Sequence, residues 1–288
     1  MKRLFICLSI IICSSVFIFA QQRPLLTDDV DITPQGSLRI SAGVDFLQNA
    51  KFPVSGLTGD QTRVGDFNVR IGLAPNVEFQ IEGTLQNFLA INSKSTSAIP
   101  LTLDNNSTND IGDFTVSTKI KLINETKKFP GIGFKFGVQL PNTNQARGIG
   151  TNQVNVFGKI LLQKKFGTNT KGQDPLVNIF ANIGLGIMPA PLERFTQNDV
   201  MLYGVGGVFR VNENINIATE INGRANTRSG KAPLGTESLS QFRIGTQIKA
   251  SGLLFDTAAI IGISKNSPRT GVTFGVTYQS KKIFIPAP

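Results

Sequence analysis

The chain has no histidine and no tryptophan, and among its 288 residues there are only two cysteines and two tyrosines. Both cysteines, Cys7 and Cys13, lie within the first twenty residues. The rest of the chain therefore has no thiol for a disulfide bond, for nucleophilic catalysis or for a zinc site with sulfur ligands. The lack of histidine excludes histidine-based triads. This composition argues against an enzyme, and we expect no catalytic residue, no metal and no cofactor.

Carboxylate or Ser–Lys chemistry is the enzymatic option that this composition leaves open. Glu78 and Glu82 project from the same face of an expected strand, because side chains two and four residues apart share a face. Such a pair could serve as acid and base. The surrounding pattern is that of a polar strand face, so we interpret both residues as part of a solvated wall.

The first twenty residues, MKRLFICLSIIICSSVFIFA, have the composition of a leader. Lys2 and Arg3 give a basic start, an apolar run follows, and Ala20 precedes polar residues. This pattern predicts a secretory signal peptide at residues 1–20. A membrane anchor is the competing interpretation, but the apolar run is short for a spanning helix. Residues 21–36 are polar with two prolines and are expected to form an extended periplasmic lead-in.

Long apolar runs are missing after residue 20, where no stretch approaches the roughly 18 apolar residues of a transmembrane helix. If the protein lies in a membrane, it must cross it as strands. The formal charge is +10 and falls by two, to +8, without Lys2 and Arg3. A basic exported chain does not suggest nucleic acid as a partner. It favours a lumen suited to anions, or contact with anionic lipid headgroups.

Alternation of apolar and polar residues is clearest between Ile111 and Thr143. Apolar residues recur at every second position from Phe114 to Leu122 and again from Ile132 to Leu140, with a polar turn between them. A period of two is typical of strands with one apolar face, and the two runs predict a hairpin.

The same pattern recurs along the chain and predicts about twelve strands. They are expected at residues 38–47, 66–73, 77–86, 114–122, 132–140, 153–166, 177–187, 200–211, 215–224, 242–249, 253–263 and 271–278.

The connections between these strands alternate in length, from short turns such as 74–76 and 251–252 to longer loops such as 48–65 and 88–110. Outer-membrane barrels have an even strand number, short periplasmic turns and long external loops. Lipid tolerates a sheet only when it is closed. The sequence therefore predicts an all-β fold, a closed antiparallel transmembrane barrel at residues 37–279, with a tail at 280–288. A soluble sandwich is the alternative, and the charged strand faces and strand glycines weigh against it.

The polar strand faces would line the interior of such a barrel. The expected lumen-lining residues are Arg39, Arg70, Glu78, Glu82, Lys119, Lys121, Lys135, Lys159, Glu220, Arg224, Arg243 and Lys249.

A barrel with this interior is expected to be a channel for small solutes in the outer membrane. Its expected partners are outer-membrane lipids, the barrel assembly machinery and a small-molecule solute. Twelve strands lie between filled eight-stranded barrels and open porins, so a plugged structural barrel remains an alternative. A surface-exposed binding protein that acts through its long loops is another.

The hairpin and the loop after it resemble the central signature of the outer-membrane barrels grouped with the MetA-pathway phenol-degradation proteins. The matching residues are Gly112-Asp113, Lys119, Leu140-Pro141-Asn142-Thr143 and Gly148-Ile149-Gly150-Thr151. The resemblance implies a transporter-like barrel that passes small molecules, aromatic ones among them, across the outer membrane.

Overall fold

The structure, a computed structural model, describes residues 23–167, 175–192 and 197–284. The expected signal peptide lies outside these ranges, as do the first two residues of the expected lead-in and the last four of the expected tail. Within the described ranges, no helix is long and apolar enough to cross a membrane.

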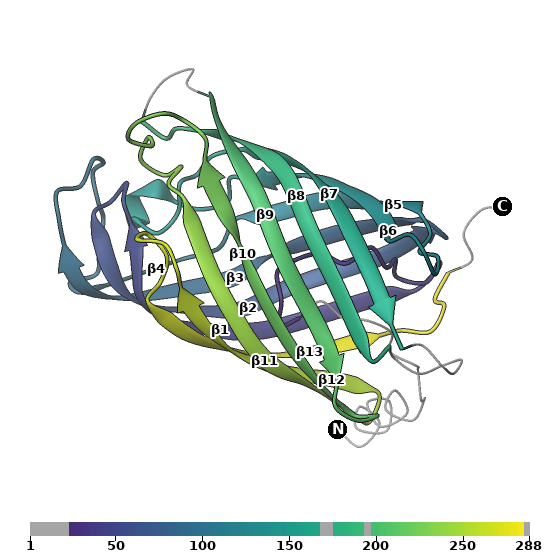
Figure 1. Cartoon of the computed structure of the whole chain (residues 1–288). Coiled ribbons are helices and arrows are strands. Elements are labelled where there is room, and N and C mark those ends of the chain that lie inside the picture. The colour runs from purple at the N-terminus through teal and green to yellow at the C-terminus, as the bar shows by residue number, and fades with distance from the viewer. Residues whose placement is uncertain (1–22, 168–174, 193–196, 285–288) are drawn as a thin grey trace.

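Twelve antiparallel strands close into a barrel (Figure 1), which confirms the predicted fold class. β1 pairs with β2 on one side and with β13 on the other, and this second pairing closes the ring. A thirteenth strand, β4, extends the sheet beside one end of β3. The strands are β1 (Leu38–Phe52), β2 (Leu57–Ala74), β3 (Val77–Lys94), β4 (Ser107–Asp110), β5 (Phe114–Ile123), β6 (Gly131–Leu140), β7 (Asn155–Phe166), β8 (Val177–Pro189), β9 (Gln197–Arg210), β10 (Ile215–Asn226), β11 (Leu239–Ala250), β12 (Leu253–Gly262) and β13 (Thr270–Gln279).

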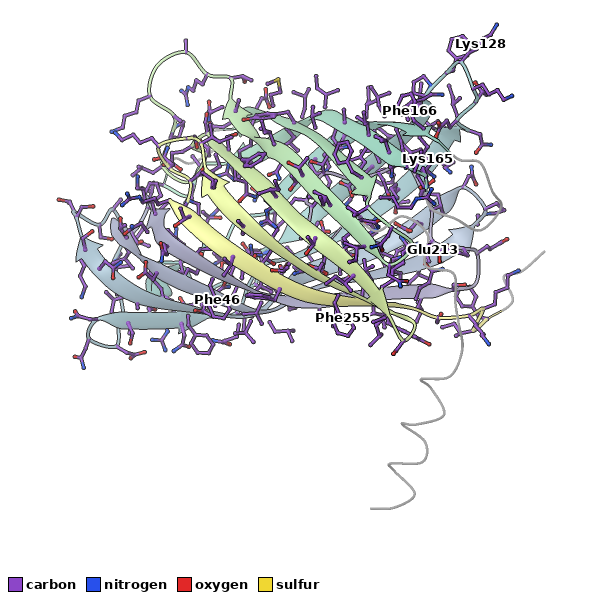
Figure 2. The ribbon with its side chains drawn as sticks, turned by 60° about the horizontal axis from the view of Figure 1, so that its bottom comes forward. Phe46, Lys128, Lys165, Phe166, Glu213 and Phe255 are labelled. Carbon is purple, nitrogen blue, oxygen red and sulfur yellow. The ribbon has the colours of Figure 1, made fainter. Side chains whose placement is uncertain are left out.

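Apolar side chains cover the outside of the barrel (Figure 2). Phe46 on β1 and Phe255 on β12 point away from the wall and are 45% and 44% exposed. The residues beside them in the chain, Asp45 and Asp256, point inward and are buried. Hydrocarbon accepts an apolar face whose backbone groups are paired within a closed sheet. The alternation read from the sequence therefore separates an apolar outer surface from a polar interior.

The first three strands are longer than the alternation indicated. β1 runs to Phe52 and β2 begins at Leu57, so most of the expected loop at residues 48–65 is strand. The expected loop at residues 88–110 contains the end of β3 and the whole of β4. The prediction of loops there was wrong because these strands extend past the outer apolar belt, whose last exposed large side chains on them are Phe46, Val64 and Phe88. Beyond that belt neither face has to be apolar, so strand pairing continues without the period of two.

The two ends of the barrel differ. Residues 75–76 join β2 to β3, and residues 251–252 join β11 to β12, at what we call the short-turn end. The opposite end, on the left of Figure 1, carries the longer connections and β4. One of these connections contains the short 3-10 helix η1 (Gln145–Arg147). We call this the long-loop end.

Candidate functional site: the occupied lumen

Residues 23–37, which we call the N-terminal segment, run inside the barrel before β1 begins. The segment follows the inner wall in strand order: residue 23 contacts β2, β12 and β13, and residues 24–28 contact β11, β10 and β8. Residues 28–31 then contact β7, β6 and β5, and residue 33 contacts β3. A periplasmic lead-in was expected for residues 21–36, and the sequence did not predict this course through the lumen.

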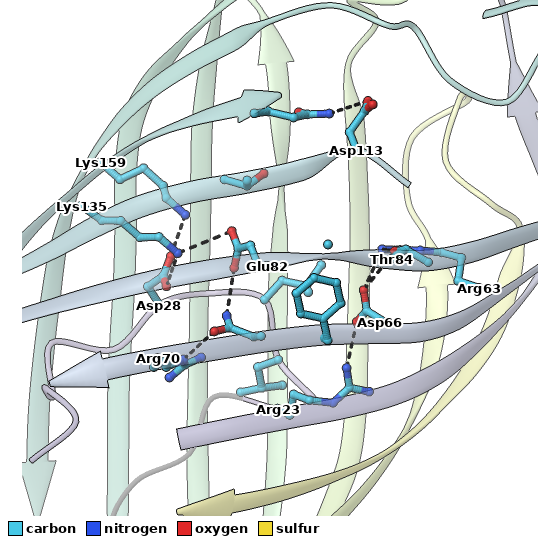
Figure 3. A pocket seen from close by; sticks show the side chains of 17 residues that line it. Arg23, Asp28, Arg63, Asp66, Arg70, Glu82, Thr84, Asp113, Lys135 and Lys159 are labelled. Carbon is cyan, nitrogen blue, oxygen red and sulfur yellow. Dashed lines mark hydrogen bonds and ion pairs between the residues drawn. The ribbon is translucent and has the colours of Figure 1, made fainter. Parts of the chain in front are cut away.

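Arg23, the first residue of the segment, binds to the barrel wall (Figure 3). Its guanidinium lies 2.8 Å from a carboxylate oxygen of Asp66 and 3.4 Å from one of Asp256, and it donates to the Thr273 hydroxyl at 3.0 Å. Arg63 reaches the other oxygen of Asp66 at 2.9 Å. Charge-assisted hydrogen bonds of this kind are among the stronger ones in proteins, so the segment starts from a fixed point on the wall.

Side chains of the wall bind the backbone of the segment. Glu220 accepts the N–H groups of Leu26 and Thr27, each at 2.8 Å. Asn182 accepts from the N–H of Asp28 and donates to its carbonyl, both at 2.7 Å. Further N–H groups are accepted by Gln163 (from Val30, 2.9 Å) and Glu78 (from Thr33, 2.6 Å). A buried backbone needs such partners, and here the barrel interior provides them.

Two aspartates of the segment pair with lysines of the wall. The two carboxylate oxygens of Asp28 lie 3.0 Å from Lys135 Nζ and 2.7 Å from Lys159 Nζ, as Figure 3 shows. Asp29 lies 3.1 Å from Lys119 Nζ. These five side chains come from the segment and from three neighbouring strands, and they form an ionic network inside the barrel.

Asp31 forms a second ionic contact nearer the short-turn end. It lies 2.6 Å from Lys165 and 3.5 Å from Lys121. Burial alone would raise the pKa of Asp31, but the two lysines lower it to about 2. For Asp28, burial is likewise opposed by Lys135 and Lys159, and its pKa falls well below the ordinary value. Both aspartates are therefore ionised at neutral pH.

Glycines on the wall let the segment approach closely. A Cβ at Gly204 would lie 2.5 Å from the Thr27 hydroxyl oxygen, and one at Gly43 would lie 2.1 Å from the guanidinium of Arg23. A Cβ at Gly72 would lie 2.3 Å from the carbonyl oxygen of Thr33. In the sequence the strand glycines were interpreted only as evidence against a soluble sandwich. These three also leave room for the segment.

A small apolar contact adds to the polar ones. Leu25 of the segment is 2% exposed and forms a buried cluster with Phe180 on β8 and Ala218 on β10, against which Val208 packs. Burying a leucine side chain contributes about 2 kcal/mol. The charged contacts are more numerous, so the segment is held mainly by ion pairs and hydrogen bonds.

At least seven of the twelve expected lumen-lining residues contact the N-terminal segment. Six of these contacts are described above, and Arg243 donates to the Pro24 carbonyl at 3.0 Å. The seven are Glu78, Lys119, Lys121, Lys135, Lys159, Glu220 and Arg243.

The other five also lie on the inner side of the wall, and Arg70 and Glu82 line the first cavity together with residues of the segment. Arg39 donates to Gln279 across the β1–β13 pairing, and Arg224 donates to the carbonyls of Gly235 and Glu237. Lys249 is half-buried near the short-turn end. The remaining two, Arg70 and Glu82, both contact Asn68.

Three cavities lie between the segment and the long-loop end. The first, about 330 Å³, is lined by Arg63, Arg70, Glu82 and other residues drawn in Figure 3. The second, about 280 Å³, shares Leu26 and Lys159 with the first. The third, about 230 Å³, is lined largely by loop residues and shares Arg224 and Leu239 with the second. The shared residues make the three cavities neighbours.

Sequence reasoning missed the partners that the segment brings to the wall. Arg23 and the aspartates at 28, 29 and 31 were read as part of an extended lead-in. One signal was present: the expected lumen set holds more lysine and arginine than glutamate, and the aspartates precede the first strand. Buried cations require counter-charges, so this excess could have pointed to them.

The comparisons with known proteins concern the fold. No family model and no curated protein sequence matches the chain. In structure it is similar to the COG4313 outer membrane channel from Pseudomonas putida F1, with a TM-score of 0.62 and 13% identity over 88% of this chain and 98% of that one. The translocator domain of the autotransporter NalP from Neisseria meningitidis (TM-score 0.44, 10% identity, 84% and 88% covered) and the outer membrane channel DcaP of Acinetobacter baumannii (0.42, 9%, 88% and 100%) are more distant. At this identity the first likeness shows that the chain has the fold of an outer-membrane β-barrel.

Proposed function

We propose that the chain is an outer-membrane channel for small polar or anionic solutes, aromatic ones included, and that its N-terminal segment closes the lumen at rest. The observation that carries the proposal is a closed barrel with an apolar outside and a charged inside that holds a non-covalently bound piece of its own chain. Side chains alone fill a barrel of eight strands. With twelve strands, the segment fills part of the interior, and its movement would widen a passage.

The cavities support a route from the long-loop end. A solute that enters between the loops would reach the third cavity, then the second, then the first. Arg224 and Lys159 lie at the two points where neighbouring cavities share residues. Cations at these points favour solutes with negative or polar groups.

The resemblance to the MetA-pathway barrels belongs to this proposal. Its signature residues contact one another: the Asp113 carboxylate accepts the N–H groups of Asn142 and Thr143 and a hydrogen bond from Gln139. A Cβ at Gly150 would lie 2.2 Å from the Thr143 hydroxyl oxygen. The signature residues thus hold a loop in place at the long-loop end. This role explains why these residue types occur there, and it supports the resemblance to the MetA-pathway barrels.

Outer-membrane lipids around the apolar belt and the barrel assembly machinery are the partners that this proposal requires. Strands with an apolar outer face and paired backbone groups suit that membrane. Cell fractionation would test the location: recovery of the protein in the soluble periplasmic fraction would contradict it.

A reversible tether tests the channel directly. An ideal Cβ at Gly204 lies 3.2 Å from the Cβ of Thr27, near the roughly 3.5–4.5 Å found in disulfides. Thr27→Cys combined with Gly204→Cys should therefore link the segment to β9, and the native cysteines lie outside the described residues. In planar bilayers we expect no opening of the oxidised protein and discrete openings after reduction. The single variant Thr27→Cys should not respond to oxidant.

The occupied lumen also favours one alternative, a closed structural barrel. A variant lacking residues 23–36 decides between the two. If this variant, the reduced double-cysteine variant and the native protein all fail to conduct ions or to swell liposomes with any small solute, the barrel is structural and the channel proposal fails.

A further inference from the structure

Three lysines lie directly opposite one another on three neighbouring strands. Lys119 on β5 is the cross-strand partner of Lys135 on β6, and Lys135 is the cross-strand partner of Lys159 on β7. Lys119 and Lys135 are almost completely buried, at 0% and 2% exposure. Like charges directly opposite each other destabilise a sheet, and burial makes an unpaired charge costly. These residues, which we call the lysine row, therefore require anionic partners.

The segment supplies the carboxylate at the centre of this row. Asp28 lies between Lys135 and Lys159, with one oxygen on each at 3.0 Å and 2.7 Å. On the wall itself, Glu82 lies 3.7 Å from Lys135 and Glu78 lies 3.3 Å from Lys119. When the segment moves away, the carboxylate that bridges the two lysines leaves with it. The row then holds a site shaped for a carboxylate.

The cavities beside the row could hold the rest of a small ligand. Lys159 lines both the first cavity, of about 330 Å³, and the second, of about 280 Å³. Its side chain is 17% exposed, so it can be approached from the cavities. Phe157, whose ring centroid is 5.5 Å from Lys159 Nζ, and Leu202 of the second cavity provide apolar surface nearby. Small-molecule sites commonly combine such apolar walls with a few polar groups.

We propose that the lysine row is a binding site for small organic carboxylates with an apolar or aromatic body, and that Asp28 occupies it at rest. This inference rests on the proposed channel function. Asp28 and a carboxylate solute exclude each other, because both bind the same Nζ atoms of Lys135 and Lys159. A ligand that binds only the released form shifts the population toward that form, so carboxylates open the channel that they pass through.

The first test compares three probes on the native chain in planar bilayers: benzoate, benzyl alcohol and inorganic phosphate. Benzoate should raise the open fraction about tenfold at a concentration about ten times its Kd for the released form. Benzyl alcohol, which has the ring without the carboxylate, should have no effect. An equal response to all three probes, or to phosphate and benzoate alike, would overturn the assignment to organic carboxylates.

The second test uses variants with a matched control. Lys135→Met combined with Lys159→Met should abolish the benzoate response, whereas Lys249→Met, which removes an inward lysine outside the row, should keep it. If the double variant does not fold, Lys159→Met alone should weaken the response about tenfold or more. The oxidised Thr27→Cys/Gly204→Cys protein should not respond at all, and reduction should restore the response.

The outcomes separate this inference from the channel function. If the reduced tethered protein conducts but the lysine variants respond to benzoate like the native chain, the carboxylate site is overturned and the channel stands. If the variant lacking residues 23–36, the reduced tethered protein and the native protein all fail to conduct, the channel function itself fails.

Discussion

A lysine that leaves water keeps its charge at an acceptable cost only when a carboxylate lies beside it. In this barrel the carboxylate that lies closest to both Lys135 and Lys159 is that of Asp28 on the N-terminal segment, which is remote in sequence. The wall therefore needs the segment for its charge balance, and the segment needs the wall for its hydrogen bonds. Because of this mutual dependence, the substitution of a single residue can test whether the segment occupies the lumen.

Glu220 is the residue whose loss should free the middle of the segment. It accepts the N–H groups of Leu26 and Thr27, each at 2.8 Å. Hydrogen bonds to a charged group contribute about 1.5–3 kcal/mol, so Glu220→Ala should speed hydrogen exchange at these two amides about tenfold to a hundredfold. Glu213→Ala, an exposed turn residue visible in Figure 2, is the control. Unchanged exchange at both amides in Glu220→Ala would show that this carboxylate does not hold the segment.

Asp31 predicts how the segment responds to acid. Its pKa is lowered to about 2 from the ordinary value of 3.8. A carboxylate with a lowered pKa stabilises the docked state at pH values above its ordinary pKa, and this contribution is lost as the pH falls through the lowered one. The contribution of Asp31 should therefore be lost only below about pH 3, where channel conductance should rise. Bilayer recordings check it, and unchanged conductance between about pH 4 and pH 2 would contradict it.

At the scale of the element, β9 contributes a surface on which the segment lies. The contacts that a Cβ at Gly204 would make are with the Thr27 side chain, between 2.5 and 3.2 Å. Gly204→Leu should therefore push the segment off the wall while the strand pairing persists, and raise the open fraction in bilayers. Gly158→Leu on β7 is the control, because a Cβ at Gly158 meets the outer Phe134 ring at 3.4 Å. Equal conductance of the two variants would show that close packing at Gly204 does not keep the lumen occupied.

The strands could be predicted from the sequence where an apolar outer face alternates with a polar inner face. The hairpin of β5 and β6 was expected at residues 114–122 and 132–140 and lies at Phe114–Ile123 and Gly131–Leu140. β1, β2 and β3 were expected too short, because their outer parts extend past the apolar belt. Alternation with a period of two indicates which strand face is apolar, and it gives no such signal where both faces are in contact with water.

At the scale of the whole molecule, the course of the N-terminal segment could not be derived from sequence pattern. Its contacts join residues far apart in the chain, such as Arg23 and Thr273, and many use backbone groups that every residue has. A polar stretch with Pro24 and Pro34 carries no periodicity that would indicate burial. The inward lysines were visible in the sequence, but their counter-charges were assigned to a stretch outside the barrel.

The fold depends on closure of the ring, and the pairing of β13 with β1 completes that closure. Val276 pairs with Ala42 on β1 and with Phe255 on β12, so it lies at the seam between the two ends of the chain. Proline there removes a donor from the ladder, which central strands do not tolerate. The native protein should migrate faster on gels before heating than after, as a closed barrel does, and Val276→Pro should lose this difference. Lys281→Pro lies just past β13 and should keep it. If Val276→Pro migrates like the native protein, pairing of β1 with β13 does not determine the stability of the barrel.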